Sequence, residues 1–418
     1  MKHTVNIFRR NEGFTLVELI LVMGIFITVL AIAGQSFNTI YSQSSRFSKS
    51  EETNIEGIIG LEVMRHDLEQ MGFGLPWGFT SSITYAEATN SSGATLNDAP
   101  SAVPRAFVAA NALGDFTSDY IGVKATTVGS TKASQRWTYM PFHNLSTSTG
   151  RVSQPVTWPI NNLNSSDNVT IVRSNFNTPS DDHLLIVDPG NNTIFYSTYG
   201  YLSGGDTIDP YFPQNDQQTH MIYGVDSNSL RMPFNRADFF IKVPDATTAS
   251  ALPQFCAPLT GVLYKATINQ SNGNDLYLPL LDCVADMQVV LGWDTSDSGK
   301  ANNVNAYSSV PASDGTVATT IPAGLQTIIQ GWLSNAQGVR EHLKMVKVYI
   351  LAQEGKRDLS YISPKASYVV GLDCNESSGV DCGSSLTRTY TLSTAQLQYR
   401  WKLYRIIVRP KNLFSNQH

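Results

Sequence analysis

A single carboxylate, that of Glu18, lies within the apolar segment near the N-terminus of this 418-residue chain. From residue 14 to residue 34 the only polar side chains are those of Thr15, Glu18 and Thr28. An acidic residue inside a membrane helix costs roughly 2.5–3.5 kcal/mol on insertion scales, so it usually has a function and a charged partner. The chemistry predicted for Glu18 is therefore ion pairing with a cation on another polypeptide. The alternative is that its side chain extends to water at the membrane interface.

The apolar segment itself predicts a membrane-spanning helix. Its 21 residues would cover about 30 Å as a helix, enough for one crossing of a bilayer. Lys2, Arg9 and Arg10 precede it, so the positive-inside rule predicts a cytoplasmic leader and an exported remainder beyond residue 40. A secretory signal peptide cleaved near residues 31–33 is the alternative. The length of the apolar run favours an anchor.

The residues around Glu18 resemble the leader of the type IV pilin superfamily, which is its class III signal. They read Gly13-Phe14-Thr15-Leu16-Val17-Glu18. The resemblance implies that a prepilin peptidase cuts after Gly13 and methylates the new N-terminus at Phe14. It also implies that Glu18 pairs with the N-terminal amine of a neighbouring subunit during assembly. The partners that it implies are the prepilin peptidase, other pilins through this helix, and the inner membrane before assembly.

A second periodic segment follows the apolar one. Its apolar residues recur at helical spacing: Ile55, Ile58, Ile59, Leu61, Met64, Leu68 and Met71. Gly72, Gly74 and Pro76 then end the pattern, as glycine and proline usually do after a helix. The sequence therefore predicts one helix from residue 14 to about 72. The end of this helix at residues 65–73, and the stretch at 283–294, resemble minor pilins of the PilW type.

Composition and strand patterns predict the rest of the fold. Charged residues make up only 15% of the chain, and short strand-like runs alternate with turn clusters, which is typical of an exported β-rich protein. The predicted fold class is α+β, with a long N-terminal helix, half membrane-embedded and half amphipathic, packed on an enlarged antiparallel sheet. The predicted parts are a leader at 1–13, a transmembrane and assembly helix at 14–40, an amphipathic helix at 41–76, a polar β-rich insert at 77–254 and a C-terminal pilin-like sheet domain at 255–418.

Individual strands are predicted in both of the last two parts. Those in the insert are short: 105–109, 168–172, 183–187 and 192–199. Those after residue 255 are longer: 259–268, 276–281, 285–293, 343–352 and 399–408. In the strand at 343–352, Val346, Val348 and Ile350 share one face and Lys347 has the other, which predicts a half-buried strand. Apolar residues at both faces from 404 to 408 predict a fully buried stretch or a bulge.

The four cysteines all lie on the predicted exported side, where disulfides form. They are Cys256, Cys283, Cys374 and Cys382. Bridges between sequence neighbours, 256–283 and 374–382, are the favoured connectivity. The first would close a loop that the chain-entropy model values at roughly 3 kcal/mol. A zinc site is the alternative, but the spacing has no Cys-x-x-Cys and the nearest upstream histidine, His220, is remote.

Catalytic motifs are not found in the sequence, so we expect neither an enzyme nor a cofactor. The seven histidines are scattered, without a His-Glu-x-x-His pattern, and no Gly-x-Ser-x-Gly elbow occurs. Asp181, Asp182 and His183 lack the serine context of a triad. Residues 294–299 weakly resemble a calcium loop, but Asn305 occupies the position of the bidentate glutamate. An ordinary loop is the favoured interpretation.

Three functions fit these features, and the resemblance favours a structural one. It is a minor pilin that primes assembly of a pilus or sits at its tip, first as a single-pass inner-membrane protein with a periplasmic head and then on the pilus at the cell surface. A minor pseudopilin of a type II secretion machine would share the same leader and helix. A tip adhesin or DNA-uptake receptor that binds its ligand through residues 77–254 is the third.

Charge argues against nucleic acid as the partner. Removal of residues 1–13 takes away three basic side chains and one acidic side chain, which changes the formal net charge from −5 to −7. DNA binding requires a basic surface that displaces counterions. Basic residues do cluster near the C-terminus: Arg400, Lys402, Arg405, Arg409 and Lys411. Alternation of solvated and buried faces along a strand explains that cluster more simply.

Overall fold

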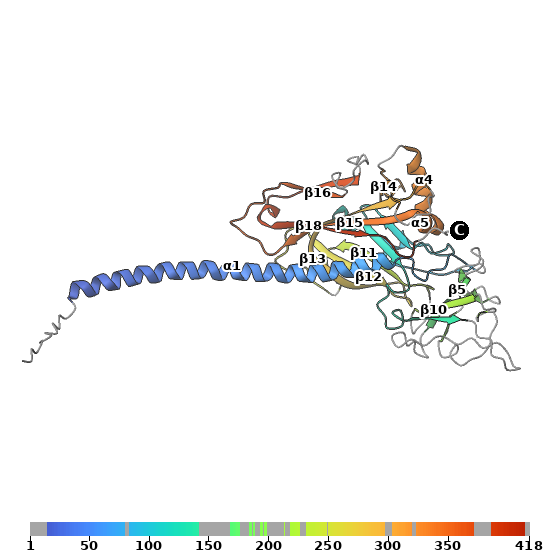
Figure 1. The fold of residues 1–418 in the computed structure, drawn as a ribbon, viewed down its shortest axis with the longest axis horizontal. Coiled ribbons are helices and arrows are strands. Elements are labelled where there is room, and N and C mark those ends of the chain that lie inside the picture. Colours follow the sequence, from blue (N-terminus) through green and yellow to red (C-terminus); the bar gives the residue numbers. More distant parts are fainter. Residues whose placement is uncertain are drawn as a thin grey trace, which may run out of the picture. The chain divides into compact units, whose positions relative to one another are not determined.

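The computed structural model describes fourteen stretches of the chain: 15–79, 83–141, 168–175, 184–185, 187–188, 193–194, 196–198, 213, 218–225, 231–248, 250–296, 303–319, 323–371 and 386–413. The chain divides into two units, Met1–Thr53 and Asn54–His418. The architecture is mixed α and β, with an apolar N-terminal helix and a large antiparallel sheet (Figure 1).

Helix α1 is a single element of 55 residues, Leu16–Gln70. It ends where the sequence predicts, because Gly72 and Gly74 both adopt positive φ, at 82° and 70°. The backbone N–H of Gly72 donates to the carbonyl of Lys124 at 3.0 Å, which ties the end of the helix to a strand of unit 2.

An eight-stranded antiparallel sheet forms the centre of unit 2. Its order is β18-β15-β13-β12-β11-β3-β2, with β14 also paired to β13. The strands are β2 (Phe107–Ala110), β3 (Tyr120–Lys124), β11 (Arg236–Lys242), β12 (Gly261–Ile268), β13 (Asp275–Trp293), β14 (Ala306–Ser309), β15 (Leu343–Glu354) and β18 (Arg400–Val408). Strand β13 replaces two predicted strands, because the register shifts beside Cys283, whose φ is 55°, without ending the pairing.

A second sheet has the order β1-β6-β5-β10-β4, with β9 paired to β5, and two small hairpins accompany it. Its strands are β1 (Gly78–Phe79), β4 (Trp137–Pro141), β5 (Asn168–Asn175), β6 (Leu184–Leu185), β9 (Tyr196–Thr198) and β10 (Gln218–Gly224). The hairpins are β7 (Val187–Asp188) with β8 (Thr193–Ile194), and β16 (Ser367–Gly371) with β17 (Thr387–Thr391). Among the described residues, the helical elements after α1 are α2 (Ser91–Ala94), η1 (Asp115–Thr117), α4 (Ala323–Leu333), α5 (Ala336–His342) and η5 (Gln396–Gln398).

Strands from both sides of residue 254, the predicted boundary between the insert and the C-terminal domain, pair in the central sheet. Strands β2, β3 and β11 come from the predicted insert, yet β11 pairs with β12 over six residues, from Ala237 with Thr267 to Lys242 with Val262. Both parts belong to the same compact unit. Backbone hydrogen bonding therefore joins the two parts of the chain that we predicted as an insert and a domain.

Both faces of strand β15 are covered, which corrects the prediction of a half-buried strand at 343–352. On one face of β15, Val346, Val348 and Ile350 join the core cluster that also contains apolar residues of α1. On the other face, Tyr349 packs with residues of the β16–β17 hairpin. Lys347 lies on this second face but is buried, with its ammonium group 4.8 Å from the centre of the Tyr307 ring.

Strand β18 has neither the bulge nor the full burial that were predicted for it. Its register with β15 is continuous from Val408 opposite Val346 to Arg400 opposite Glu354. Ile407 remains 49% exposed on the face opposite Ile406. The strand is therefore regular, with one exposed apolar side chain.

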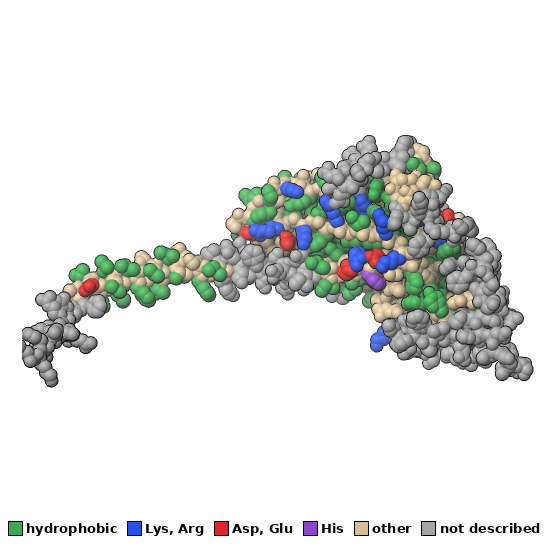
Figure 2. Space-filling view, viewed as in Figure 1, with side chains coloured by type: hydrophobic (Ala, Val, Ile, Leu, Met, Phe, Trp, Pro, Cys, Tyr) green, Lys and Arg blue, Asp and Glu red, His purple; other side chains and the backbone are tan. Residues whose placement is uncertain are grey.

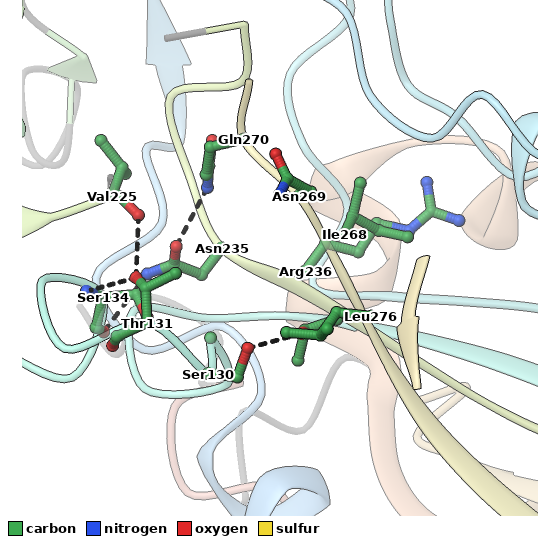
Figure 3. Close-up of a pocket in the computed structure, with 12 residues that line it drawn as sticks. Ser130, Thr131, Ser134, Val225, Asn235, Arg236, Ile268, Asn269, Gln270 and Leu276 are labelled. Carbon is green, nitrogen blue, oxygen red and sulfur yellow. Dashed lines mark hydrogen bonds between the residues drawn. The ribbon is translucent and has the colours of Figure 1, made fainter. Parts of the chain in front are cut away.

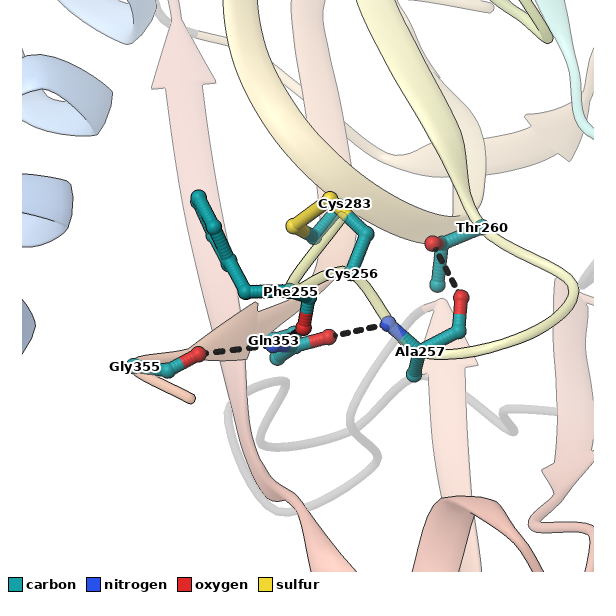
Figure 4. Close-up of a disulfide and its surroundings, with 7 residues drawn as sticks. All are labelled: Phe255, Cys256, Ala257, Thr260, Cys283, Gln353 and Gly355. Atoms are coloured by element: carbon teal, nitrogen blue, oxygen red, sulfur yellow. Dashed lines mark hydrogen bonds between the residues drawn. A yellow bond between two sulfur atoms is a disulfide. The ribbon is translucent and has the colours of Figure 1, made fainter. Parts of the chain in front are cut away.

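A disulfide joins Cys256 to Cys283, the first of the two neighbour pairings that the sequence favours (Figure 4). Gln353 of β15 holds the same loop: its side-chain oxygen accepts from the N–H of Ala257 at 2.6 Å, and its amide donates to the carbonyl of Phe255 at 2.9 Å. The loop is thus fixed to two adjacent strands. Cys374 and Cys382 lie outside the described residues.

Asp119, next to β3, is a buried carboxyl that should make unit 2 less stable as pH rises. Burial raises the pKa of Asp119 to about 8, and the negative charge of nearby Asp286 raises it further. A hydrogen bond from the Val289 N–H at 2.7 Å lowers the pKa but does not cancel the rise. Because the folded-state pKa exceeds the unfolded value of about 3.9, the folded chain binds the extra proton between about pH 4 and 8. The shift corresponds to stabilisation on the order of 5 kcal/mol, present in full below about pH 4 and lost progressively as pH rises from about 4 to 8.

Asp119→Asn should remove this pH dependence, since the amide resembles the protonated acid in shape. We expect the free energy of unfolding of the variant to exceed that of the wild type more at pH 9 than at pH 5, as measured by urea denaturation in detergent. Asp314→Asn is the control, because Asp314 is exposed and hydrogen bonds from Thr316 lower its pKa, so it stays ionised over this range. An equal difference at both pH values would contradict the assignment.

Candidate functional site

Thr15 caps the N-terminus of α1, and its hydroxyl also lies beside the Glu18 carboxylate. The Thr15 hydroxyl oxygen accepts from the backbone N–H of Glu18 at 3.3 Å, and the hydroxyl lies 3.4 Å from a carboxylate oxygen of the same glutamate. A threonine followed three residues later by glutamate is the capping-box pattern. The carboxylate therefore lies in the first turn, at the positive end of the helix dipole.

The helix surface around this cap is apolar and uncovered in the structure. Residues Leu16–Phe37 form a 22-residue stretch that is long and apolar enough to cross a membrane, and none of it is buried (Figure 2). Its large apolar side chains up to Ile32 are 54–74% exposed. Such a surface needs lipid or another apolar partner. By length and composition it is a candidate membrane anchor, and an N-terminal signal sequence meets the same criteria.

Glu18 is the only charged residue of this stretch. Thr28 is a polar residue in the middle of the same apolar stretch. Its hydroxyl is satisfied within the helix, because it donates to the carbonyls of Gly24 at 3.0 Å and Ile25 at 2.7 Å. A cation for Glu18 must therefore come from outside Leu16–Phe37. The predicted cleavage and methylation residues, Gly13 and Phe14, lie outside the described residues.

Within unit 2, the last part of α1 packs on the sheet through the predicted face from Leu61 onward, but not through the isoleucines before it. Met64 and Leu68 are buried as expected. Ile58 and Ile59, predicted on the same face, are 55% and 63% exposed. The buried positions instead begin with glycines, which hydrophobic periodicity does not count. They are Gly57, Gly60, Leu61, Met64, Asp67, Leu68 and Met71, a regular helical stripe.

The two glycines allow α1 to approach strand β13 closely. A Cβ atom added to Gly60 would lie 1.9 Å from the carbonyl oxygen of Leu280 and 2.6 Å from its carbonyl carbon. At Gly57 the nearest atom would be the Cδ1 of Leu281, 2.8 Å away, at the end of a flexible side chain. The helix therefore rests on backbone at one glycine and on a movable side chain at the other.

Ion pairs fix the end of the helix to the sheet. Asp67 is almost completely buried, and its carboxylate lies 2.5 Å from the ammonium of Lys265 on β12. Burial raises the pKa of Asp67, while Lys265 opposes that rise. Glu69 pairs with Lys411 at 2.8 Å, and the N–H of Lys411 donates to the Glu69 carbonyl at 3.0 Å.

A network of buried charges, which the sequence analysis missed, joins distant parts of unit 2. The guanidinium of Arg236 lies 2.9 Å from Glu87 and 2.8 Å from Asp238. The ammonium of Lys124 lies 2.8 Å from Glu87 and 2.5 Å from Asp98. All five side chains are buried. Glu87 and Arg236 are 149 residues apart, so no local pattern could have indicated this pairing.

The loop that weakly resembles a calcium site uses its ligand candidates internally. One carboxylate oxygen of Asp294 accepts from the N–H and hydroxyl of Ser296 and from the amide of Asn303, at 2.8–3.0 Å. Asn305 accepts from Thr295. In the stretches that the structure describes, no group of three or more His, Cys, Asp or Glu side chains is placed to hold a metal ion. Asp181, Asp182 and His183 lie outside these stretches.

A small hollow of about 310 Å³ lies beside β12, lined by the loop at 129–134 and by residues 267–270 (Figure 3). Most of its polar groups bond to one another. Ser130 and Thr267 share a hydrogen bond of 2.7 Å, and the Gln270 amide donates to Asn235 at 3.0 Å. These contacts fix the loop to the strand, and the hollow offers few free groups to a ligand.

The apolar helix with its single carboxylate is therefore the candidate functional site, and the structure places it on an uncovered surface with its charge at the helix start. Comparison of the chain with protein-family models, with curated proteins and with solved structures finds no match in any of the three.

Proposed function

We propose that this protein is a minor type IV pilin, a structural subunit that primes assembly of a pilus or sits at its tip. In this proposal a prepilin peptidase removes residues 1–13, Phe14 becomes the methylated N-terminus, and α1 anchors the subunit in the inner membrane until assembly. The head is then exported and reaches the cell surface with the pilus.

One observation carries the proposal. A single carboxylate, that of Glu18, lies in the first turn of an uncovered apolar helix, four residues after the Gly13-Phe14 pair. A simple anchor gains nothing from Glu18, because a charge weakens membrane insertion. A helix that associates with copies of itself or with related helices gains an ion pair. Supporting this, Leu16–Phe37 contains no other charge and Thr28 is satisfied within the helix.

The cap made by Thr15 gives Glu18 a competing structural role, and two variants separate the roles. Glu18→Gln preserves a capping box, which accepts Glu or Gln at this position, but removes the charge. Thr15→Ala removes the capping hydroxyl, at a cost of about 1 kcal/mol in helix stability, and preserves the charge. We expect Glu18→Gln to insert in the membrane but to be lost from assembled pili, whereas Thr15→Ala still assembles.

The measurement is the amount of each variant in sheared pilus fractions and in membranes, in cells that also express a prepilin peptidase and the other pilins. Intact mass of the purified chain is measured first, and we expect cleavage after Gly13 with one added methyl group on Phe14. Incorporation of Glu18→Gln into pili at the wild-type level would show that assembly does not need the charge of Glu18, and only its role at the helix start would remain. A first residue beyond Ala33 would refute pilin processing altogether.

A further inference from the structure

A polar hollow of about 450 Å³ opens in unit 2 beside strands β11 and β13. Two segments from the predicted insert, residues 90–92 and 113–115, complete its wall. Unlike the hollow beside β12, it combines an aromatic wall with polar groups that have unused hydrogen-bonding capacity.

The aromatic wall is rigid. Tyr120 stacks on Phe240 with ring centres 4.6 Å apart, and Phe240 meets Tyr277 edge to face at 6.2 Å. The hydroxyl of Tyr120 donates to Asp238 at 2.8 Å, which anchors the buried end of the set. Tyr277 is only half-buried, so its ring is the part of the wall that a ligand can reach.

Two carboxylates are already oriented at the wall of the hollow. Asp275 accepts from the Asn90 amide at 2.6 Å and from the Tyr277 hydroxyl at 2.9 Å, and each of its oxygens retains a second lone pair. One oxygen of Asp115 accepts from the N–H of Val243 at 2.7 Å. Its other oxygen has no partner among the described residues.

Donors are also present. Lys242 pairs with Asp245 at 2.8 Å and has two further N–H protons. The hydroxyls of Ser91 and Ser92 bond to nothing in the described part of the chain. The hollow therefore offers fixed acceptors, rotatable hydroxyls and one ammonium beside an accessible aromatic ring.

We propose that this hollow binds a neutral hexose unit of a glycan. A hexose ring has an apolar face that can pack on Tyr277 and hydroxyl groups that both donate and accept. The two carboxylates and one ammonium give the lining a net negative charge, which disfavours phosphate and acidic sugars. A neutral polyhydroxylated ring fits this combination better than an ion or an apolar ligand.

The test is saturation-transfer NMR on the full chain, in a zwitterionic detergent without a sugar headgroup, with D-glucose, D-galactose and D-mannose as separate probes. We expect transfer to the ring protons of at least one hexose. Tyr277→Leu should weaken that binding at least tenfold. Tyr368→Leu is the matched control, because Tyr277 and Tyr368 are both half-buried strand tyrosines with a lysine over the ring, Lys242 at 5.9 Å and Lys365 at 5.6 Å. We expect Tyr368→Leu to bind the hexose as the wild type does.

Asp115→Asn is a second variant that keeps an oxygen for the Val243 N–H and removes the charge. We expect it to weaken hexose binding several-fold without changing the thermal unfolding midpoint. Absence of transfer from all three sugars, or equal transfer in Tyr277→Leu and the wild type, would overturn the proposal. Either result leaves the processing of Gly13 and Phe14 untouched, so the two proposals succeed or fail separately.

Discussion

Gly60→Ala is expected to destabilise unit 2 by about 3 kcal/mol or more, although alanine favours a helix by roughly 1 kcal/mol over glycine. The reason is the backbone of Leu280, whose carbonyl oxygen would lie 1.9 Å from the new Cβ. Helix α1 and strand β13 must move apart to make room for the Cβ. This movement would also expose part of the apolar surface that Met64 and Leu68 now bury in the core.

Gly57→Ala provides the matched control three residues earlier in the same helix. Its Cβ would lie 2.8 Å from the Cδ1 of Leu281, which can change rotamer, and at an ordinary contact distance of 3.8 Å from the Tyr404 hydroxyl. Helix propensity and this small adjustment oppose each other, so we expect a change within about 1 kcal/mol. Urea denaturation of both variants, followed by tryptophan fluorescence, measures the difference. Equal stability of the two variants would show that α1 does not rest on the backbone of β13.

Arg236→Met is the second substitution with a large expected effect, a loss of about 3–5 kcal/mol in the free energy of unfolding. Burial opposes the charge of Arg236, yet Asp238 and Glu87 hold its pKa above the usual value. Methionine has a similar length but leaves both carboxylates buried without this partner. Glu87→Gln in the Arg236→Met background should recover part of the loss, because it removes one of those charges.

Arg65→Met is the control for loss of an arginine that contacts two carboxylates. Arg65 pairs with Glu62 and Glu69 on the surface of α1, where solvent screens the charges. We expect little change in its unfolding midpoint. If Arg65→Met and Arg236→Met were equally destabilised, burial would not be the source of the effect.

Strands with long, regular patterns were predictable from the sequence, and those with short or mixed ones were not. Strands β12, β15 and β18 lie within two residues of their predicted limits because each is a long run rich in strand-forming residues. Strand β3 and strand β11 were not predicted. Both are buried along almost their whole length, and β11 contains Arg236 and Asp238, buried charges that pair with each other while Arg236 also pairs with the distant Glu87.

The candidate site was predictable where its signal is local in the sequence, and not where it depends on distant contacts. Glu18 stands out within its own segment, and the threonine three residues before it could have been recognised as a cap. The packing face of α1 was harder, because Gly57 and Gly60 contribute no hydrophobic signal and the nearby Ile58 and Ile59 contribute a strong one. Contact with Leu280, more than two hundred residues away, selects the glycine face.

The hydrogen bonding of β11 to β12 also limits where this protein can be shortened. A chain cut at residue 254 would lose β2, β3 and β11 together and leave β12 as an open edge rich in apolar side chains. Unpaired edges of this kind recruit other strands and promote aggregation. Removal of smaller loops that keep all seven strands of the main sheet path is the practical route to trimmed forms of the head.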